Sequence, residues 1–352
     1  MLRSYQAKEE LLLTQVALSL TQTTGLQVVD MGQEILHSKT RWDAEVTLTD
    51  GTTQWKYLVE VKSLLTSNAL EHLIYQLTKY KNESHYPLLL VAPYINPKQA
   101  DKLRDQNIEF LDLAGNAYLK QPGLFVFITG QKPSESGKAT DQKARAFNQT
   151  GLRLIFALLT QPGLEQETYR VQAQRSGISL GAVAWVMNDL QKLGYLEDRG
   201  KFGRRLVQKK ELLDRWVPAY LEQLRPKLLF GRYQSSQPQW WEKVSLVIHV
   251  IGAFWGGEVG AEILTNYLQP ATATVYAETN LPRLQAQFGL RKNQLGNTEI
   301  LRKFWIAPEW ETKEKQVAPP LVVYADLIAL GDSRTRETAK IIYDQYLAQL
   351  VK

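Results

Sequence analysis

Two groups of residues in this chain have types and a spacing that could do chemistry. The first is a pair of acids with a lysine: Asp43, then Glu60, then Lys62. Asp43 opens one predicted strand and Glu60 closes its predicted hairpin partner, so the two carboxylates are expected to meet at a sheet edge. Carboxylate oxygens are the ligands that Mg²⁺ prefers, and the pair could hold one such ion.

Lys62 is expected to point to the same side as Glu60, because side chains alternate along a strand and one residue separates the two. A lysine there could orient or deprotonate a water that attacks a phosphodiester, while the metal stabilises the developing charge. The predicted helix over 70–80 carries Gln76 and Tyr80, which are four residues apart and therefore share a face. The alternative is a surface Glu–Lys pair at the end of a strand.

The second group is a run of cations between positions 199 and 210 with no acid among them. Such a run is costly unless it faces water or phosphates, and counterion release makes phosphates the favourable partner. The alternative is a solvated basic turn in a module used for protein contacts. The run consists of Arg199, Lys201, Arg204, Arg205, Lys209 and Lys210.

Apolar periodicity predicts helices in the stretch that precedes these cations, over 152–159, 167–175 and 180–193. Ser179 is expected to cap the third helix, and Gly177 and Gly194 to end the second and third. Two short strands around a glycine-rich tip are predicted over 195–207. This order predicts a winged helix-turn-helix, with the third helix in a DNA major groove. The residues expected to contact DNA are Ser179, Asn188, Lys192, Arg199, Lys201, Arg204, Arg205 and Lys209.

The third helix has few side chains that could read base edges. Its exposed start is Ser179-Leu180-Gly181-Ala182, and only Asn188 and Lys192 follow. Since bidentate contacts to bases need longer polar side chains, we expect modest sequence readout, with the affinity carried by backbone contacts.

The first third of the chain predicts a mixed α/β sheet. Asp50-Gly51 is a hairpin signal between two of its strands. Helices are predicted over 10–20, 70–80 and 97–105. Strands are predicted over 26–29, 44–48, 57–61, 87–92, 110–113 and 124–128.

The rest of the chain predicts an exposed linker, a helix and a further α/β domain. The helix over 212–230 is expected to be interrupted at Pro218 and Pro226, and 233–239 to form a second joint. Further on we expect a turn over 255–258, a helix over 259–268, a strand over 272–277, an apolar segment from 321 and a helix over 335–350. His249 is interpreted as a core residue and Glu262 as a solvated acid. The predicted domains are 1–130, 147–232 and 240–352, with a linker over 131–146.

The balance of hydrophobic and charged residues is that of a folded globular protein. The lack of cysteine excludes disulfides and a thiol nucleophile and is typical of a reducing cytoplasm, where we place the protein. A net charge of +6 is compatible with nucleic acid. We find neither a signal peptide nor an apolar run long enough to span a membrane, so no membrane partner is expected.

Asp43 with Glu60-Val61-Lys62 resembles the PD-(D/E)xK nuclease superfamily, and Gln76 with Tyr80 resembles the motif of its RecB-like branch. The resemblance implies a restriction-endonuclease-like domain over 1–130. It also implies Mg²⁺ or Mn²⁺ at Asp43 and Glu60 where cleavage is retained. A helical acid before the sheet is usual in that superfamily, and Glu9, Glu10 or Glu34 could supply it.

Three further passages are similar to the AbiEi family, which comprises antitoxins and transcriptional regulators of type IV toxin–antitoxin systems. They are 110–118 (FLDLAGNAY), 151–159 (GLRLIFALL) and 324–329 (YADLIA) with Gly331-Asp332. The resemblance implies a DNA-binding repressor of its own operon. We expect it to bind double-stranded DNA without a cofactor, with a homodimer as one possibility. It also implies a nucleotidyltransferase-like toxin, countered without tight contact.

Two alternatives remain beside that regulator. One is a Mg²⁺-dependent DNA nuclease delivered by the winged helix, and the other is a non-catalytic scaffold. The turn, helix and strand over 255–277 faintly resemble a nucleotidyltransferase, but such enzymes hold two metals with an acid pair on that strand. Because 272–277 contains no acid, this domain is interpreted as a degenerate form used for recognition.

Overall fold

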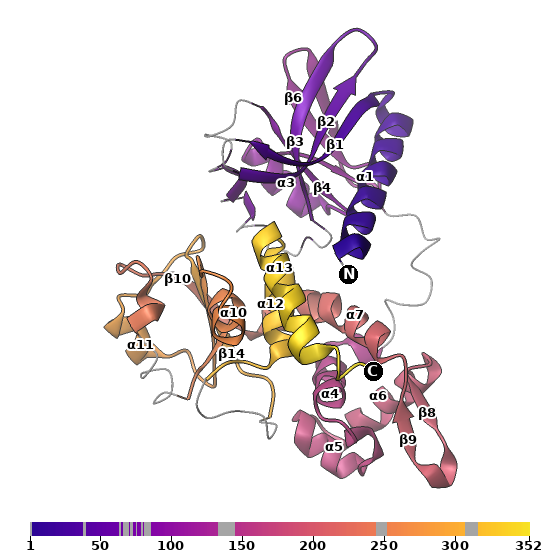
Figure 1. The fold of residues 1–352 in the computed structure, drawn as a ribbon, viewed down its shortest axis with the longest axis vertical. Coiled ribbons are helices and arrows are strands. Elements are labelled where there is room, and N and C mark those ends of the chain that lie inside the picture. The colour runs from indigo at the N-terminus through magenta and orange to yellow at the C-terminus, as the bar shows by residue number, and fades with distance from the viewer. Residues whose placement is uncertain are drawn as a thin grey trace. The chain divides into compact units, whose positions relative to one another are not determined.

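The structure is a computed structural model. It describes residues 2–37, 40–62, 65, 70, 73–74, 76–78, 80, 86–132, 145–243, 252–306 and 316–352. The chain divides into the compact units Met1–Ala139 and Thr140–Lys352 (Figure 1). A large mixed sheet lies in the first unit and another mixed sheet in the second, which confirms the predicted α/β class.

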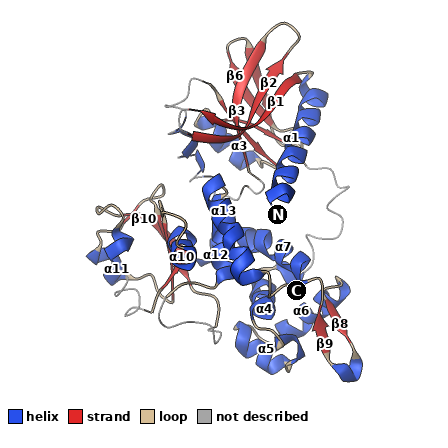
Figure 2. Cartoon of the chain, in the orientation of Figure 1, coloured by secondary structure: helices blue, strands red, loops and turns tan. Residues whose placement is uncertain are grey.

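The sheet of the first unit, whose strands are red in Figure 2, keeps its strands in sequence order. The first three strands form an antiparallel meander. The next strand, β4, pairs parallel with β3, and β5 pairs parallel with β4. At the other edge, β6 pairs antiparallel with β5 and β7 pairs antiparallel with β6. The strands are β1 (Gln27–His37), β2 (Thr40–Thr49), β3 (Gln54–Val61), β4 (Leu88–Ala92), β5 (Glu109–Asp112), β6 (Ala117–Gln121) and β7 (Leu124–Ile128).

Both faces of this sheet are covered by helices. Val59 and Leu89 pack in one core with apolar residues of α1 (Leu2–Thr24). Leu58 and Leu90 face the other core, which holds Leu70, Leu73 and Leu77 and residues of α3 (Pro97–Asp105). The alternation along each strand therefore sends successive side chains into opposite cores, as expected for a doubly covered sheet. The helix predicted over 70–80 is helical at its described positions.

The second unit opens with a cluster of helices followed by a hairpin. Side-chain caps begin the helices at Asn148, Thr168 and Ser179. The cap at Ser179 was predicted, as was Gly177, which ends the second helix in the left-handed region. The helices are η2 (Arg145–Phe147), α4 (Gln149–Thr160), η3 (Leu164–Gln166), α5 (Tyr169–Ser176) and α6 (Leu180–Lys192). The antiparallel hairpin is β8 (Leu196–Asp198), η4 (Gly200–Phe202) and β9 (Arg204–Leu206).

The helical segment after the hairpin differs from its prediction. Its elements are α7 (Lys209–Ala219), the π-helical turn η5 (Tyr220–Leu224) and α8 (Arg225–Leu228). The helix continues through Pro218 instead of stopping there. A proline lacks the N–H for the bond one turn back, and the switch to π-helical bonding directly after it is a way for a helix to absorb such a defect. The prediction was also wrong for Leu229 and Phe230 of the expected helix, and for Tyr233 and Gln234 of the expected joint, because all four lie in a strand.

That strand belongs to the sheet of the second unit, in which the order is β11-β12-β14-β10-β13. The strands are β10 (Leu229–Gln234), β11 (Phe254–Gly256), β12 (Ala273–Ala277), β13 (Arg291–Lys292) and β14 (Thr298–Arg302). The helices are η6 (Trp240–Lys243), α10 (Gly257–Thr265), α11 (Pro282–Gln287), α12 (Pro320–Leu330), α13 (Ser333–Ile342) and η7 (Tyr343–Leu347).

Tryptophan side chains lie in the core beside the sheet of this unit. Trp240, Trp241 and Trp255 are all buried, and the ring of Trp240 lies 5.7 Å from that of Trp255. Glu262 is exposed, as predicted, whereas His249 lies outside the described residues. No helix within the described ranges has the length and apolar character needed to cross a bilayer.

Candidate functional site

The cations of the hairpin fall into two groups in the structure. Arg204 donates from Nη2 to the carbonyl oxygen of Glu167 at 2.6 Å, and its guanidinium carbon lies 4.7 Å from the centre of the Tyr169 ring. It thereby fastens the hairpin to the start of α5. Arg199 pairs with Glu197, with Nη2 and Oε2 2.7 Å apart. These two arginines are partly committed to the fold of the hairpin.

Arg205 and Lys209 have no acidic partner among the described residues. Arg205 stands opposite Glu197 in the strand register, but Glu197 is bound by Arg199. Both cations border a hollow of about 260 Å³ on the side of the hairpin. Because most of the polar lining is cationic, the hollow suits an anionic group such as a phosphate. It is lined by Glu165, Gln166, Arg199, Phe202, Arg204, Arg205, Leu206, Lys209 and Lys352.

The remaining predicted DNA contacts lie on α6. The Ser179 Oγ accepts a hydrogen bond from the Ala182 N–H at 3.3 Å, so this side chain caps the helix. Asn188 and Lys192 are exposed. Leu180 is 52% exposed at the first turn. It leaves an apolar surface where a base-reading side chain would be expected.

The predicted acid–lysine group of the first unit is brought together. The register of β2 against β3 places Ala44 opposite Val59, and the Val61 N–H donates to Asp43 Oδ2 at 2.8 Å. Lys62 Nζ lies 2.7 Å from Glu60 Oε1, and the lysine is only 5% exposed. The nearly buried Lys62 ammonium is thus held by the Glu60 carboxylate, while the Asp43 carboxylate binds the backbone of Val61, the residue between Glu60 and Lys62.

The two residues of the neighbouring helix are half-buried. Tyr80 lies edge-on to Trp42, with ring centres 5.5 Å apart, and Trp42 directly precedes Asp43. The helix therefore sits over the strand that carries the acid. Gln76 is also half-buried.

The predicted metal ligands of the first unit are the two carboxylates of Asp43 and Glu60. Within the described ranges, no group of three or more His, Cys, Asp or Glu side chains could hold an ion. Asp43 and Glu60 alone would fit Mg²⁺ or Mn²⁺, since Mg²⁺ is commonly held by one or two carboxylates and keeps several waters. The side chains of Glu9, Glu10 and Glu34, the expected sources of a third acid, lie outside the described residues.

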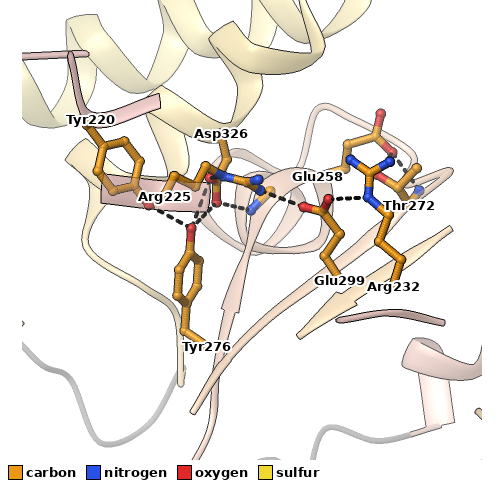
Figure 3. A network of polar contacts seen from close by, with 9 residues as sticks. Tyr220, Arg225, Arg232, Glu258, Thr272, Tyr276, Glu299 and Asp326 are labelled. Carbon is orange, nitrogen blue, oxygen red and sulfur yellow. Dashed lines mark hydrogen bonds and ion pairs between the residues drawn. The ribbon is translucent and has the colours of Figure 1, made fainter. Parts of the chain in front are cut away.

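A buried ionic network in the second unit was not predicted (Figure 3). Arg225, which is 8% exposed, donates from Nε to Asp326 Oδ1 at 2.8 Å and from Nη2 to Glu299 Oε2 at 2.7 Å. Arg232 binds the other oxygen of Glu299 at 2.8 Å. Burial raises the pKa of Glu299, but the two guanidinium groups overcome this and lower it to about 2.

Hydroxyl and backbone groups complete the network around Asp326. The Tyr276 hydroxyl donates to its carboxylate at 2.9 Å, and the Gly257 N–H donates to Oδ2 at 3.1 Å. The Tyr220 hydroxyl lies 3.0 Å from that of Tyr276. A Cβ on Gly256 would lie 2.5 Å from the Tyr276 ring, so this position needs glycine. The network ties η5 and α8, which follow the hairpin, to β12, β14 and α12.

A second buried acid, Glu258, lies at the start of α10. It accepts from the Thr272 N–H at 2.8 Å and pairs with Arg334 Nη2 at 2.6 Å. Burial raises the pKa of this carboxyl despite these partners. Charged residues inside apolar segments were the available signal for both sites: Asp326 interrupts the apolar run of α12, and Glu258 follows two glycines.

The second unit thus joins a capped helical cluster with a basic hairpin to an α/β sheet through buried ion pairs. Residues 205–348 match the family model described as "Transcriptional regulator, AbiEi antitoxin, Type IV TA system". This part of the chain belongs to the AbiEi family of antitoxins and transcriptional regulators, as predicted. The matched range holds Arg205, Lys209 and the whole Arg225 network. Neither a curated protein nor a solved structure matches the chain.

Proposed function

We propose that this antitoxin-type regulator binds double-stranded DNA with the hairpin β8–β9 as the wing and α6 as the recognition helix of a winged helix-turn-helix. The observation that carries the proposal is the position of Arg205 and Lys209, which have no acidic partner in the described part of the chain, at a basic hollow beside the capped helices. Phosphates would release counterions on binding there, which favours DNA over water as the partner.

The hairpin and α6 would have separate roles in DNA binding. The hairpin cations would hold phosphates, while α6 would lie in the groove with Asn188 and Lys192 toward the bases. A homodimer is the proposed binding unit, since dimers of such modules read paired half-sites. The family supports a cognate toxin as the second partner, and we propose a nucleotidyltransferase-like one. DNA binding requires no cofactor in this scheme.

A titration of labelled DNA tests the proposal. The protein is mixed with its own upstream DNA and with unrelated DNA over a range of salt concentrations, and anisotropy is recorded. Arg205→Ala with Lys209→Ala should weaken binding to both DNAs and lower the salt slope by about 0.9 for each lost phosphate contact. Arg283→Ala with Lys292→Ala is the matched control, because it removes two exposed cations elsewhere in the same unit. Unchanged binding by the hairpin variant contradicts the proposal.

A metal-dependent DNA nuclease is the second candidate function. It is favoured by the meeting of Asp43, Glu60 and Lys62, and by the order of one helix, three antiparallel strands, helical residues and a parallel strand, which resembles the restriction-endonuclease-like core. Asp43 and Glu60 would hold Mg²⁺ or Mn²⁺, which would stabilise charge on the cleaved phosphodiester. Lys62 would hold or move the proton of the attacking water, and Gln76 and Tyr80 would line the site.

A further inference from the structure

The tip of the hairpin exposes a large aromatic side chain. Phe202 is 74% exposed, although phenylalanine is one of the residue types most often buried in folded proteins. It lies between Lys201 and Gly203, with the Lys201 ammonium 5.2 Å from the centre of its ring. No described ring–ring contact involves Phe202, so its exposed face is available to a partner outside the chain.

The tip is built to hold this ring outward. The Arg199 N–H donates to the Gly203 carbonyl oxygen at 2.9 Å, and the Gly203 N–H donates to that of Gly200 at 3.0 Å. The Asp198 carboxylate accepts from the Gly200 N–H at 2.9 Å. Gly200 and Gly203 both adopt positive φ angles, which glycine allows at little cost. Arg204, which directly follows the tip, also holds this end of the hairpin to the Glu167 carbonyl oxygen, so the ring is presented on an ordered turn.

The surroundings of Phe202 indicate the chemistry of its partner. Arg199, Arg205 and Lys209 line the same hollow as Phe202, so the partner offers negative charge together with a flat apolar slot. Stacked base pairs between phosphates offer both. The exposed first turn of α6, with Leu180 and Gly181, supplies few contacts to base edges. Sequence specificity would then come from the energy needed to deform the DNA, which depends on its base sequence.

We propose that Phe202 is a wedge that enters the minor groove and partly unstacks one base step, bending the DNA toward the major groove. This rests on the proposed DNA-binding function. Because pyrimidine–purine steps unstack most easily, the wedge favours sites with TA or CA/TG at the position under the hairpin tip. Recognition would then depend on DNA deformability beside the contacts of α6.

Two measurements on the full chain test the wedge. Footprinting first locates the bound site in the upstream DNA, and energy transfer between dyes at the ends of a fragment with that site then reports its bend. The variants are Phe202→Ala and Phe202→Trp, with Phe125→Ala as the control because Phe125 is a comparably exposed phenylalanine (71%) in the other unit. Phe202→Ala should abolish the bend and weaken binding to this site roughly tenfold, the loss expected for one aromatic–base contact. Phe202→Trp should keep the bend.

Binding to unrelated DNA distinguishes the proposed wedge at Phe202 from the proposed DNA binding by the hairpin cations. Phe202→Ala should leave it nearly unchanged, because the cations still hold phosphates, while Arg205→Ala with Lys209→Ala should lower it. An unaltered bend with Phe202→Ala overturns the wedge and leaves the regulator standing. Failure of the unmodified protein to bind any DNA overturns the proposed function itself. Loss of toxin neutralisation in Phe202→Ala with the bend intact assigns the tip to a protein contact and also overturns the wedge.

Discussion

The Arg204 guanidinium lies over the Tyr169 ring, 4.7 Å from its centre, while the neighbouring Arg205 has no partner among the described residues. The two arginines are adjacent in sequence and identical in charge, but only the Arg204 side chain is held by contacts within the described part of the protein. Arg204 also donates to the Glu167 carbonyl oxygen, so it joins the hairpin to the loop before α5. A count of cations treats both as phosphate ligands, whereas the structure makes Arg204 a positioning residue.

Separate substitutions at Arg204 and Arg205 should therefore have distinct effects. Arg204→Ala should speed hydrogen exchange of the amides in β8 and β9, because the hairpin loses its attachment. Arg205→Ala should leave exchange unchanged and lower the salt slope of DNA binding by about 0.9. Exchange measured by mass spectrometry, with anisotropy titrations, checks both. Equal exchange in the two variants would show that the contact with Tyr169 does not order the hairpin.

Arg225 should be the residue of the second unit most sensitive to substitution. Arg225→Met leaves the partly buried Glu299 with one partner and the buried Asp326 without its cation. Removing one member of a buried ion pair costs about 3–5 kcal/mol. Urea unfolding followed by tryptophan fluorescence measures the loss, since the Trp240 cluster lies in this unit. Arg283→Met is the control, and it should leave the free energy of unfolding nearly unchanged because Arg283 is exposed.

The network should also make stability depend on acid pH. The pKa of Glu299 is about 2 in the folded protein, below the ordinary value of 4.5, so its stabilisation is present above pH 4.5 and is lost as pH falls toward 2. Burial raises the pKa of Asp326, which works in the opposite direction. Glu299→Gln should therefore flatten the fall in unfolding free energy between pH 4.5 and 2. An acid limb as steep as that of the unmodified protein would contradict this role.

Local signals in the sequence were sufficient for the helical cluster and its hairpin. Ser179 and Gly177 act through backbone groups within a few residues, and apolar periodicity marked the first helix, so α4 to α6 were predictable to within a few positions. The acid–lysine group was predictable for the same reason, because a hairpin turn at Asp50 fixed its register.

Long-range pairing set the limit of prediction. Arg225 meets Asp326 across 101 positions and Glu299 across 74, and no periodicity relates such residues. The strands β10, β13 and β14 were missed because they are short and take their pairing from partners distant in sequence. The turn expected over 255–258 was wrong as well, because Trp255 and Gly256 lie in β11, paired with β12, and Gly257 and Glu258 begin α10. The strand β6 was missed, because its first two residues were interpreted only as the end of the family motif over 110–118 and no element was predicted for the other three.

That motif has a structural role that can be tested. The Asp112 carboxylate is buried and accepts from the Ile95 N–H at 2.8 Å and from the Asn116 N–H and Nδ2 at 2.9 and 2.7 Å. Asp112→Ala leaves these donors unsatisfied, at a cost of about 1–3 kcal/mol for each buried group. Thermal unfolding should show the transition of the first unit moving to lower temperature, with the second unit unchanged. Asp105→Ala, at an exposed position on α3, is the control.

Lys62 offers the sharpest test of the first unit. Its ammonium is 2.7 Å from Glu60 and almost buried, next to the strand that carries Asp43. If the unit cuts DNA, supercoiled plasmid should be nicked with Mn²⁺ or Mg²⁺ and not without metal, and Lys62→Ala should stop nicking. DNA affinity should stay within about twofold, because the phosphates are held by the hairpin of the other unit.

Lys56 provides the matched control on the same pair of strands. It forms an ion pair with Glu45, 2.6 Å apart, but is exposed, so Lys56→Ala removes a lysine of the same sheet without touching the Asp43 cluster. Nicking should persist in that variant. Intact plasmid under every metal condition, together with a normal shift of the upstream DNA, would instead show that Lys62 and Glu60 are an ion pair of the fold, since a buried lysine at a strand end needs such a partner whether or not the site is catalytic.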